Sequence, residues 1–238
     1  MPNDQASKII IIPTYNERNN VVKLINHILD LNLNVFILVV DDNSPDGTGL
    51  VVDQLAKKYV EVTVLHRPKK EGLGKAYIAG FKYCVEKGCD YVITMDADMS
   101  HDPKYLKDSL KTIESNDVAI GSRYIKGVSV VNWSIKRLLL SYYANRYIRF
   151  ITNLPVKDCT SGFICFRSKT LKSLNLQGSF RSHGYSFLVE IKYLLYKKKF
   201  KMAEFPIIFI ERREGETKLD AKVLLESFLN PLKLRLRL

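Results

Sequence analysis

The sequence lacks the features that mark secreted and membrane-spanning chains. Residues 1–7 are polar and contain no apolar stretch of the kind found in a secretory signal. The longest apolar runs, at 8–13, 35–40 and 205–210, fall far short of the roughly 20 residues that a helix needs to cross a bilayer. We therefore expect the chain to be soluble or peripheral to a membrane.

Cysteine is scarce, and its spacing excludes common metal and redox sites. The four cysteines, Cys84, Cys89, Cys159 and Cys165, form no C-x-x-C pair, which zinc and dithiol chemistry usually require. We expect reduced and mostly buried thiols.

Acidic residues are outnumbered by basic ones. Lys and Arg total 37 against 25 Asp and Glu, and the formal net charge is +12. Such a surplus suits nucleic acid, nucleotides and an anionic membrane surface equally well. The aromatic residues are not interleaved with cations in a recognisable nucleic-acid-binding motif, so a nucleic-acid-binding α/β module is disfavoured and no nucleic-acid partner is expected.

The two best-known phosphate loops are also missing. Neither G-x-G-x-x-G nor G-x-x-x-x-G-K-[ST] occurs in the chain. Residues 71–75, Glu-Gly-Leu-Gly-Lys, form a glycine-rich stretch that opens a predicted helix. This stretch could cradle phosphate, but more often such a stretch is only a tight turn.

The pattern that is present predicts an α/β fold. With 238 residues and 46% hydrophobic content, the chain can bury one substantial core, so we expect a single domain over 1–238. Short β-rich runs alternate with amphipathic segments, which predicts a mainly parallel central sheet with helices on both faces. The expected strands are 8–12, 35–40, 62–65, 91–95 and 118–120, and the expected helices are 19–30, 49–58, 75–87 and 103–114.

Polar clusters follow four of these strands, at 13–17, 41–48, 96–101 and 121–124. Ligands of such sheets bind outside the carboxyl ends of the strands. The most informative cluster contains Asp96 and Asp98. On an extended chain, residues two apart face the same side, and two close carboxylates call for a cation. Their oxygens suit Mg²⁺ or Mn²⁺ carried with a diphosphate. The alternative is a pair of solvated carboxylates, with Asp98 capping the next helix.

Two further segments are candidates for membrane contact. Residues 133–151 mix aromatic and aliphatic residues with Lys and Arg, which is typical of a helix lying in a membrane interface. An ordinary helix packed on the sheet is the alternative. Residues 219–238 form a basic amphipathic C-terminal segment that could dock on a membrane or a partner, or fray.

Several motifs converge on one family. The matching stretches are 13–17 (PTYNE), 41–48 (DDNSPDGT), 72–76 (GLGKA), 96–101 (DADMSH), 121–124 (GSRY), 160–163 (TSGF) and 215–218 (GETK). Through them the chain resembles the family 2 glycosyltransferases, particularly the polyprenyl- (dolichol-) phosphate mannose synthases. The resemblance implies a GT-A (Rossmann-like) fold and inverting transfer of mannose from GDP-mannose to dolichyl or polyprenyl phosphate. The product, dolichyl phosphate mannose, would serve protein glycosylation and GPI anchor biosynthesis.

The resemblance also implies roles for individual residues. The nucleotide pocket would comprise Pro13, Tyr15, Glu17, Val40 and Asp42. The donor and its Mg²⁺ or Mn²⁺ would be held by Asp96, Ala97 and Asp98, with Ser100 as a further metal ligand through its hydroxyl or a water. Phosphate groups would be bound by Arg123, Arg212 and Lys218, and the acceptor lipid phosphate by Arg137. Asp98 and Arg123 would be the catalytic residues.

A lipid phosphate needs little activation as a nucleophile, because its second pKa lies near 6 by analogy with phosphorylated side chains. This favours a metal-binding and positioning role for Asp98, while a role as proton acceptor stays open. The competing interpretations are a UDP-glucose-dependent dolichyl-phosphate glucosyltransferase and a catalytically silent subunit. We expect peripheral attachment, with or without small membrane-anchoring subunits. The location would be the cytoplasmic face of the endoplasmic reticulum or of a prokaryotic inner membrane.

Overall fold

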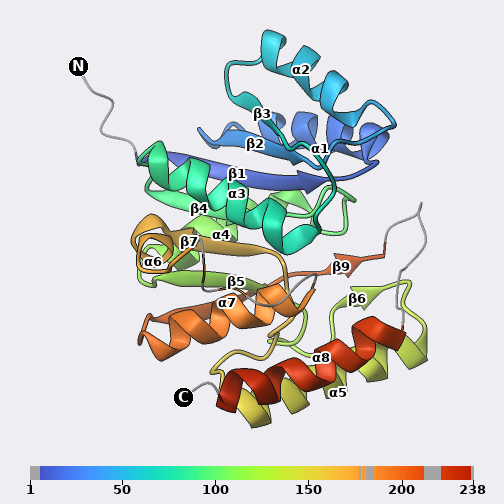
Figure 1. Ribbon diagram of the computed structural model, residues 1–238, viewed down its shortest axis with the longest axis vertical. Coiled ribbons are helices and arrows are strands. Elements are labelled where there is room, and N and C mark those ends of the chain that lie inside the picture. The colour runs from blue at the N-terminus through green and yellow to red at the C-terminus, as the bar shows by residue number, and fades with distance from the viewer. Residues whose placement is uncertain (1–5, 177, 179, 181–184, 212–220, 237–238) are drawn as a thin grey trace.

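A computed structural model of the chain describes residues 6–176, 178, 180, 185–211 and 221–236. A seven-stranded sheet crosses the molecule in the order β3-β2-β1-β4-β7-β5-β8 (Figure 1). Its strands are β1 (Lys8–Thr14), β2 (Phe36–Asp41), β3 (Val62–His66), β4 (Tyr91–Thr94), β5 (Val118–Ser122), β7 (Ile164–Arg167) and β8 (Met202–Pro206). A second sheet pairs β6 (Val130–Val131) with β9 (Phe209–Ile210).

The helices confirm the alternation expected in the first half of the chain. They are α1 (Arg18–Asp30), α2 (Thr48–Lys58), α3 (Leu73–Glu86), the 3-10 turn η1 (Pro103–Tyr105) with α4 (Leu106–Ile113), α5 (Ile135–Thr152), α6 (Ser168–Lys172), α7 (Tyr185–Lys197) and α8 (Ala221–Leu236). All five expected strands form, each within two residues of its expected ends. The segment 103–114, expected as one helix, divides into η1 and α4.

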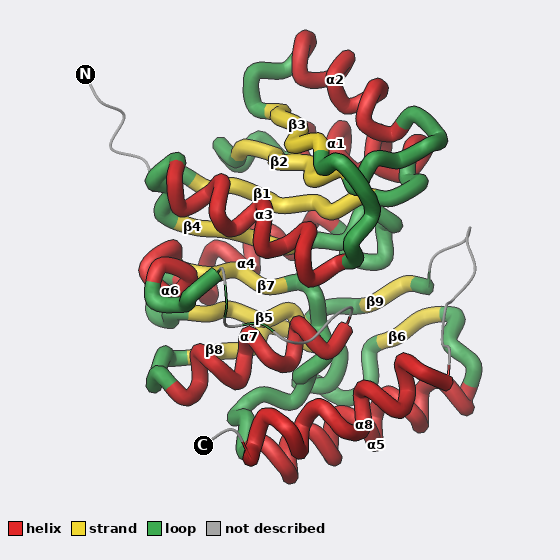
Figure 2. Tube along the Cα trace, in the orientation of Figure 1, coloured by secondary structure: helices red, strands yellow, loops and turns green. Residues whose placement is uncertain are grey.

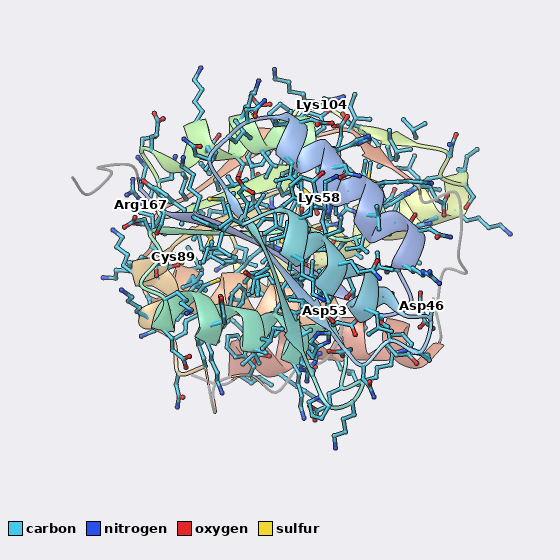
Figure 3. All side chains as sticks on the ribbon, turned by 90° about the horizontal axis from the view of Figure 1, so that it is seen from above. Asp46, Asp53, Lys58, Cys89, Lys104 and Arg167 are labelled. Carbon is cyan, nitrogen blue, oxygen red and sulfur yellow. The ribbon has the colours of Figure 1, made fainter. Side chains whose placement is uncertain are left out.

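The sheet is mainly parallel, with one strand running against the rest. β7 pairs antiparallel with both β4 and β5, and thus lies between two strands that are parallel to their other neighbours. Arg167, at the carboxyl end of β7, therefore lies opposite Tyr91, at the amino end of β4. Figure 3 shows Arg167 and Cys89 together at one end of the sheet and Asp46 at the other.

Two apolar cores form because alternate residues of each strand point to opposite faces of the sheet. Ile9 and Ile11 of β1 belong to the core beneath α3 and α7, whereas Ile10 and Ile12 belong to the core beneath α1, α2 and α4. Every one of these isoleucines is buried. Helices thus cover both faces of the sheet, as expected (Figure 2). The four cysteines are free and buried, as the sequence predicted.

α5 and α8 lie side by side at the end of the molecule farthest from α2 (Figure 1). The ring of Tyr147 stacks on that of Phe228 with 4.7 Å between centroids, and the Tyr147 hydroxyl donates to the Phe228 carbonyl. The segments expected at 133–151 and 219–238 are therefore both helical over most of their length, and they pack on each other. Within the described residues, no helix combines the length and apolarity needed to cross a bilayer.

Candidate active site

The carboxyl ends of β1, β2 and β4 meet at one edge of the sheet, as the polar clusters predicted. The register pairs Pro13 with Val40 and Thr14 with Asp41. On the other side of β1, the Met95 amide donates to the Ile11 carbonyl, so the chain leaving β4 begins beside β1. Pro13 is half-buried, whereas Val40 is fully buried. The Val40 side chain therefore belongs to the core beneath this edge and is not exposed to a ligand.

Asp41 fixes the loop that follows β2. Its buried carboxylate accepts hydrogen bonds from the Thr14 hydroxyl (3.0 Å), the Ser44 amide (3.0 Å) and the Ser44 hydroxyl (2.6 Å). The same Ser44 hydroxyl accepts from the Asn16 amide. The loops after β1 and β2 are thus tied together before any ligand arrives.

Asp42, expected in the nucleotide pocket, forms a buried ion pair with Arg67. Its second oxygen accepts from the Glu71 amide at 3.2 Å. Arg67 also donates to the Glu71 carboxylate, which pairs in turn with Lys75. A carboxylate has about four acceptor positions, so Asp42 keeps capacity for a ribose hydroxyl or a base edge while Arg67 holds its orientation.

Tyr15 and Glu17 lie on the loop after β1. The Lys70 ammonium lies 3.6 Å from the centroid of the Tyr15 ring, so one ring face already carries a cation. A purine would stack on the other face or exchange with Lys70. The Glu17 carboxylate accepts from the Asn20 side chain at 2.8 Å, and the Glu17 amide donates to the Thr48 hydroxyl.

Asp96 and Asp98 lie on a turn, because β4 ends at Thr94. The expectation that the chain stays extended through Asp96 and Asp98, so that both side chains face the same side, is therefore wrong. Met99 adopts a left-handed conformation (φ 61°), which reverses the chain, and Asp98 accepts from the Ser100 amide at 3.1 Å across this turn. Asp98 does not cap the next helix, since Asp102 caps η1 instead.

Tyr77, Gly162 and His101 surround Asp96. The Tyr77 hydroxyl donates to its carboxylate at 3.3 Å. A Cβ at Gly162 would lie 3.6 Å from both carboxylate oxygens, so the glycine keeps space beside them. The Asp96 amide donates to Nδ1 of His101 at 3.4 Å, which places the imidazole proton on Nε2. Burial lowers the pKa of His101, so the ring is neutral at pH 7.

These residues fit a divalent cation shared with a diphosphate. The Ser100 hydroxyl is buried and has no hydrogen-bond partner among the described residues, so its oxygen remains available as a ligand. In the described ranges, no three His, Cys, Asp or Glu side chains come together as a metal cluster. The two carboxylates would therefore hold a metal only jointly with other oxygen ligands, such as diphosphate and water.

Arg123, expected at a phosphate, is buried and paired. Its Nε and Nη2 donate to the two oxygens of Asp158 at 2.7 and 2.6 Å, and Nη2 also donates to the Thr160 hydroxyl. Burial opposes the charged form, but the attraction of Asp158 outweighs it and raises the pKa of Arg123. For Asp158 burial is likewise outweighed by Arg123, which lowers the pKa of the carboxyl.

Trp133 joins Arg123 to Arg137, the residue expected at the acceptor phosphate. The two guanidinium carbons lie 5.5 and 4.4 Å from the Trp133 ring. Arg137 also pairs with Glu211, and both side chains of this pair are about a quarter exposed. The centroid of the Phe209 ring lies 5.5 Å from the Arg123 guanidinium carbon and 5.5 Å from the centroid of the His101 ring. Phe209 therefore links the two arginines to the turn that carries Asp96 and Asp98, called the Asp96 turn below.

Three elements hold the segment that carries Asp158 and Gly162. From β8, Glu204 accepts from the amides of residues 157 and 158. From α5, Asn145 accepts from the amides of residues 159 and 160. From α7, the buried Lys192 ammonium donates to the carbonyls of residues 159 and 161, and burial lowers its pKa to about 8.

The structure thus gathers Pro13, Val40, Asp42, Asp96, Ala97, Asp98, Ser100, Arg123 and Arg137 on the carboxyl edge and the loops beside it. Arg212 and Lys218 lie outside the described residues. Sequence reasoning missed Arg67, Tyr77, Asp158 and Lys192. No local motif marks Arg67 or Lys192; Asp158 could have been found only as the acidic residue just before the TSGF stretch.

Comparison with known proteins shows the family of the chain. A family model described as glycosyl transferase family 2 matches residues 9–174. A polyprenol monophosphomannose synthase from Mycolicibacterium smegmatis is 40% identical over 221 residues, covering 92% of this chain and 83% of the relative. An undecaprenyl-phosphate mannosyltransferase from Micrococcus luteus is 38% identical, covering 93% and 91%. A dolichol-phosphate mannosyltransferase from Pyrococcus furiosus is 39% identical, covering 91% and 60%.

Two solved structures share the fold. A glucosyl-3-phosphoglycerate synthase from Mycobacterium tuberculosis, bound to Mn²⁺, UDP and phosphoglyceric acid, has a TM-score of 0.72 at 16% identity, covering 98% of this chain and 79% of its own. A mannosyltransferase from Pyrobaculum calidifontis, bound to GDP-mannose and Mn²⁺, has a TM-score of 0.61 at 14% identity, covering 98% and 64%. The fold is the expected GT-A fold.

Proposed function

The chain belongs to glycosyl transferase family 2, and on that premise we propose that it transfers mannose from GDP-mannose to a dolichyl or polyprenyl phosphate. The observation that carries the proposal is its 38–40% identity to three polyprenyl-type phosphate mannosyltransferases over more than nine-tenths of its length. The Asp96 turn and the arginine cluster supply the groups that this reaction needs.

The donor would lie across the carboxyl edge of the sheet. Its guanosine would contact Tyr15, Glu17 and Asp42, and its diphosphate would reach the Asp96 turn. Asp96 and Asp98, with the Ser100 hydroxyl, would hold Mg²⁺ or Mn²⁺ there. When bound, the ion would stabilise the negative charge that develops on the diphosphate as it leaves.

The acceptor would approach from the side of Trp133. One oxygen of the lipid phosphate forms a bond to C1 of mannose while the bond from C1 to the donor diphosphate breaks, and the electron pair leaves with GDP. A phosphate whose second pKa is near 6 is already mostly anionic at pH 7, so the step needs no proton transfer. Arg137 would hold this phosphate and Arg123 would act near the transferring group.

The lipid acceptor calls for attachment to a membrane. The basic surplus of the chain and the apolar side chains of α5 suit a peripheral contact, alone or with a small anchoring subunit. We place the enzyme on the cytoplasmic face, where GDP-sugars are made. This is the endoplasmic reticulum in a eukaryote and the inner membrane in a prokaryote, and relatives from two bacteria and an archaeon favour the latter.

The test is transfer of labelled sugar to a short polyprenyl phosphate in detergent. GDP-mannose and UDP-glucose are supplied separately, each with Mg²⁺, with Mn²⁺ and with EDTA. We expect a mannolipid from GDP-mannose only, lost with EDTA and restored by excess metal. Transfer from UDP-glucose alone would replace the proposal with a glucosyltransferase, and no transfer from either donor would indicate a silent subunit.

A further inference from the structure

The outward face of α5 exposes large apolar side chains. Ile135, Leu139, Tyr142, Arg146 and Phe150 recur every three or four residues, so they form one stripe along the helix. All five are exposed, with Ile135 75% and Phe150 81% accessible. A helix packed on a core normally turns its apolar side inward. Here the inward side carries Asn145 and Ile148, and the apolar stripe faces outward.

Two cations lie in and beside this stripe at the end of α5. Arg146 and Arg149 are three residues apart and both exposed. Together with Phe150, Asn153 and Leu154 they line a hollow of about 440 Å³. In the part of the chain that the structure describes, neither guanidinium group has a hydrogen bond or an ion pair; that of Arg146 has only the Tyr142 ring, 6.0 Å away.

This hollow is separate from the active site. Arg137, beside Trp133, lies at the other end of α5, and twelve residues of helix place Arg149 about 18 Å away along the axis. A helix lying flat on a surface would nevertheless bring both ends to the same surface. Figure 1 shows α5 and α8 lying along one end of the molecule, where such a surface can reach both.

We propose that the outward stripe of α5 docks on a bilayer that contains anionic phospholipids, and that Arg146 and Arg149 hold a headgroup phosphate in the hollow beside Phe150. The aromatic ring enters the acyl boundary while the two guanidinium groups stay at the level of the phosphates. This inference rests on the proposed membrane attachment and deepens it by naming the lipid class and the residues that select it.

Charge decides between a bilayer and a second copy of the chain as the occupant. A copy would bring another net charge of +12 against this face, whereas an anionic bilayer complements it. The mixture of apolar and basic side chains also matches the two chemical layers of a lipid interface.

The test is sedimentation of the full chain with vesicles of phosphatidylcholine alone or mixed with phosphatidylglycerol. The variants are Arg146→Gln with Arg149→Gln, and Phe150→Ser. The matched control is Lys57→Gln with Lys58→Gln, which removes two charges from exposed positions on α2, at the far end of the molecule (Figure 1). Because Arg149 also lies near the negative end of the helix dipole, the helix content of each variant is checked by circular dichroism.

We expect the wild-type chain to prefer the mixed vesicles. The arginine variant should bind them about twenty-five-fold more weakly, at about fivefold for each of the two basic residues removed from an anionic surface. Phe150→Ser weakens binding as well, and the lysine variant binds nearly as the wild type does. Equal losses in the two double variants, or equal binding to both vesicle types, would overturn the headgroup site. Self-association through this face without vesicle binding would assign it to a second copy.

Mannosyl transfer to a short acceptor in detergent separates this inference from the proposed function. The arginine variant should transfer at the wild-type rate there, because the hollow lies away from the reacting groups. A wild-type chain that binds mixed vesicles but transfers nothing would contradict the proposed function and leave the headgroup site standing. A wild-type chain that transfers mannose in detergent but does not bind anionic vesicles would contradict the headgroup site and leave the proposed function standing.

Discussion

Asp42 and Arg67 form an ion pair in which both side chains are more than nine-tenths buried. Arg67 comes from the chain just after β3, so the pair links the β2 edge to the loop that opens α3 through Glu71. We infer that Arg67 is a positioning residue, which fixes the Asp42 carboxylate for the nucleotide without touching the reacting atoms.

Arg67→Met tests this role. Removing one partner of a buried pair costs about 3–5 kcal/mol of unfolding free energy, because the other charge is left uncompensated. The double variant Arg67→Met, Asp42→Asn should recover most of that stability in urea unfolding. We expect the KM of the double variant for GDP-mannose to remain at least about tenfold above the wild-type value, because one charge-assisted hydrogen bond to the donor is lost. Its kcat should be nearly unchanged. A wild-type KM in the double variant would remove Arg67 and Asp42 from donor binding.

Glu211→Gln should strengthen acceptor binding. Glu211 pairs with Arg137, and a lipid phosphate would have to compete for that guanidinium. A partly exposed pair is worth up to about 1 kcal/mol, so we expect the KM for polyprenyl phosphate to fall about two- to fivefold. The control is Glu114→Gln at the exposed end of α4. An unchanged or higher KM for the lipid would show that Arg137 does not bind its phosphate.

Lys192 should make stability depend on pH in the alkaline range. Burial lowers its pKa to about 8 in the folded chain, against 10.5 when exposed. Between pH 8 and 10.5 the unfolded chain binds more protons than the folded chain, so the free energy of unfolding rises with pH. The total rise is up to about 3 kcal/mol, and this added stability is lost again as the pH falls through 8. Thermal melts from pH 7 to 10.5 should show this rise in the wild type and in Lys197→Met, an exposed control on α7. In Lys192→Met the rise should be absent, and a slope equal to that of the wild type would contradict the assignment.

Gly162→Ala should impair activity without destabilising the fold. The added methyl would contact both Asp96 oxygens at 3.6 Å and meets only ordinary contacts elsewhere. We expect metal affinity, followed as the Mn²⁺ dependence of transfer, to fall about tenfold or more, as seen when the surroundings of metal ligands change. Gly80→Ala is the converse control, since its methyl would lie 2.8 Å from Ile11 and should cost about 1–3 kcal/mol of stability. Full Mn²⁺ affinity in Gly162→Ala would show that the space beside Asp96 is not needed.

The first half of the fold could be predicted because its information is local. Each of β1 to β5 is a short apolar run next to an amphipathic helix, and that alternation specifies a parallel sheet. β7 escaped prediction because four residues between the TSGF stretch and the short helix α6 carry little pattern. Its antiparallel place between β4 and β5 depends on pairings about 45 to 75 residues apart in the sequence.

The candidate site divides in the same way. Asp96 and Asp98 stand out in the sequence because two carboxylates two residues apart, directly after an apolar strand, are chemically unusual. The partners that orient the site do not, since Arg67, Asp158 and Lys192 are ordinary charged residues until the fold buries them. Nor could the sequence show that Asp96 and Asp98 lie on a turn, because the left-handed conformation of Met99 has no glycine or asparagine to signal it.

The proposed reaction depends most directly on the charge of Asp98. Asp98→Asn keeps an oxygen that can accept from the Ser100 amide, so the turn should persist while the negative charge is lost. Asp102→Asn is the matched control, with the same change in a residue of the same loop that accepts from the Lys104 amide. The measurement is the rate of mannolipid formation from GDP-mannose with saturating Mn²⁺. We expect at least a hundredfold loss for Asp98→Asn, equal to about 3 kcal/mol, with an unchanged melting temperature and a nearly wild-type rate for Asp102→Asn. Wild-type turnover by Asp98→Asn would contradict the proposal that this turn holds the donor diphosphate.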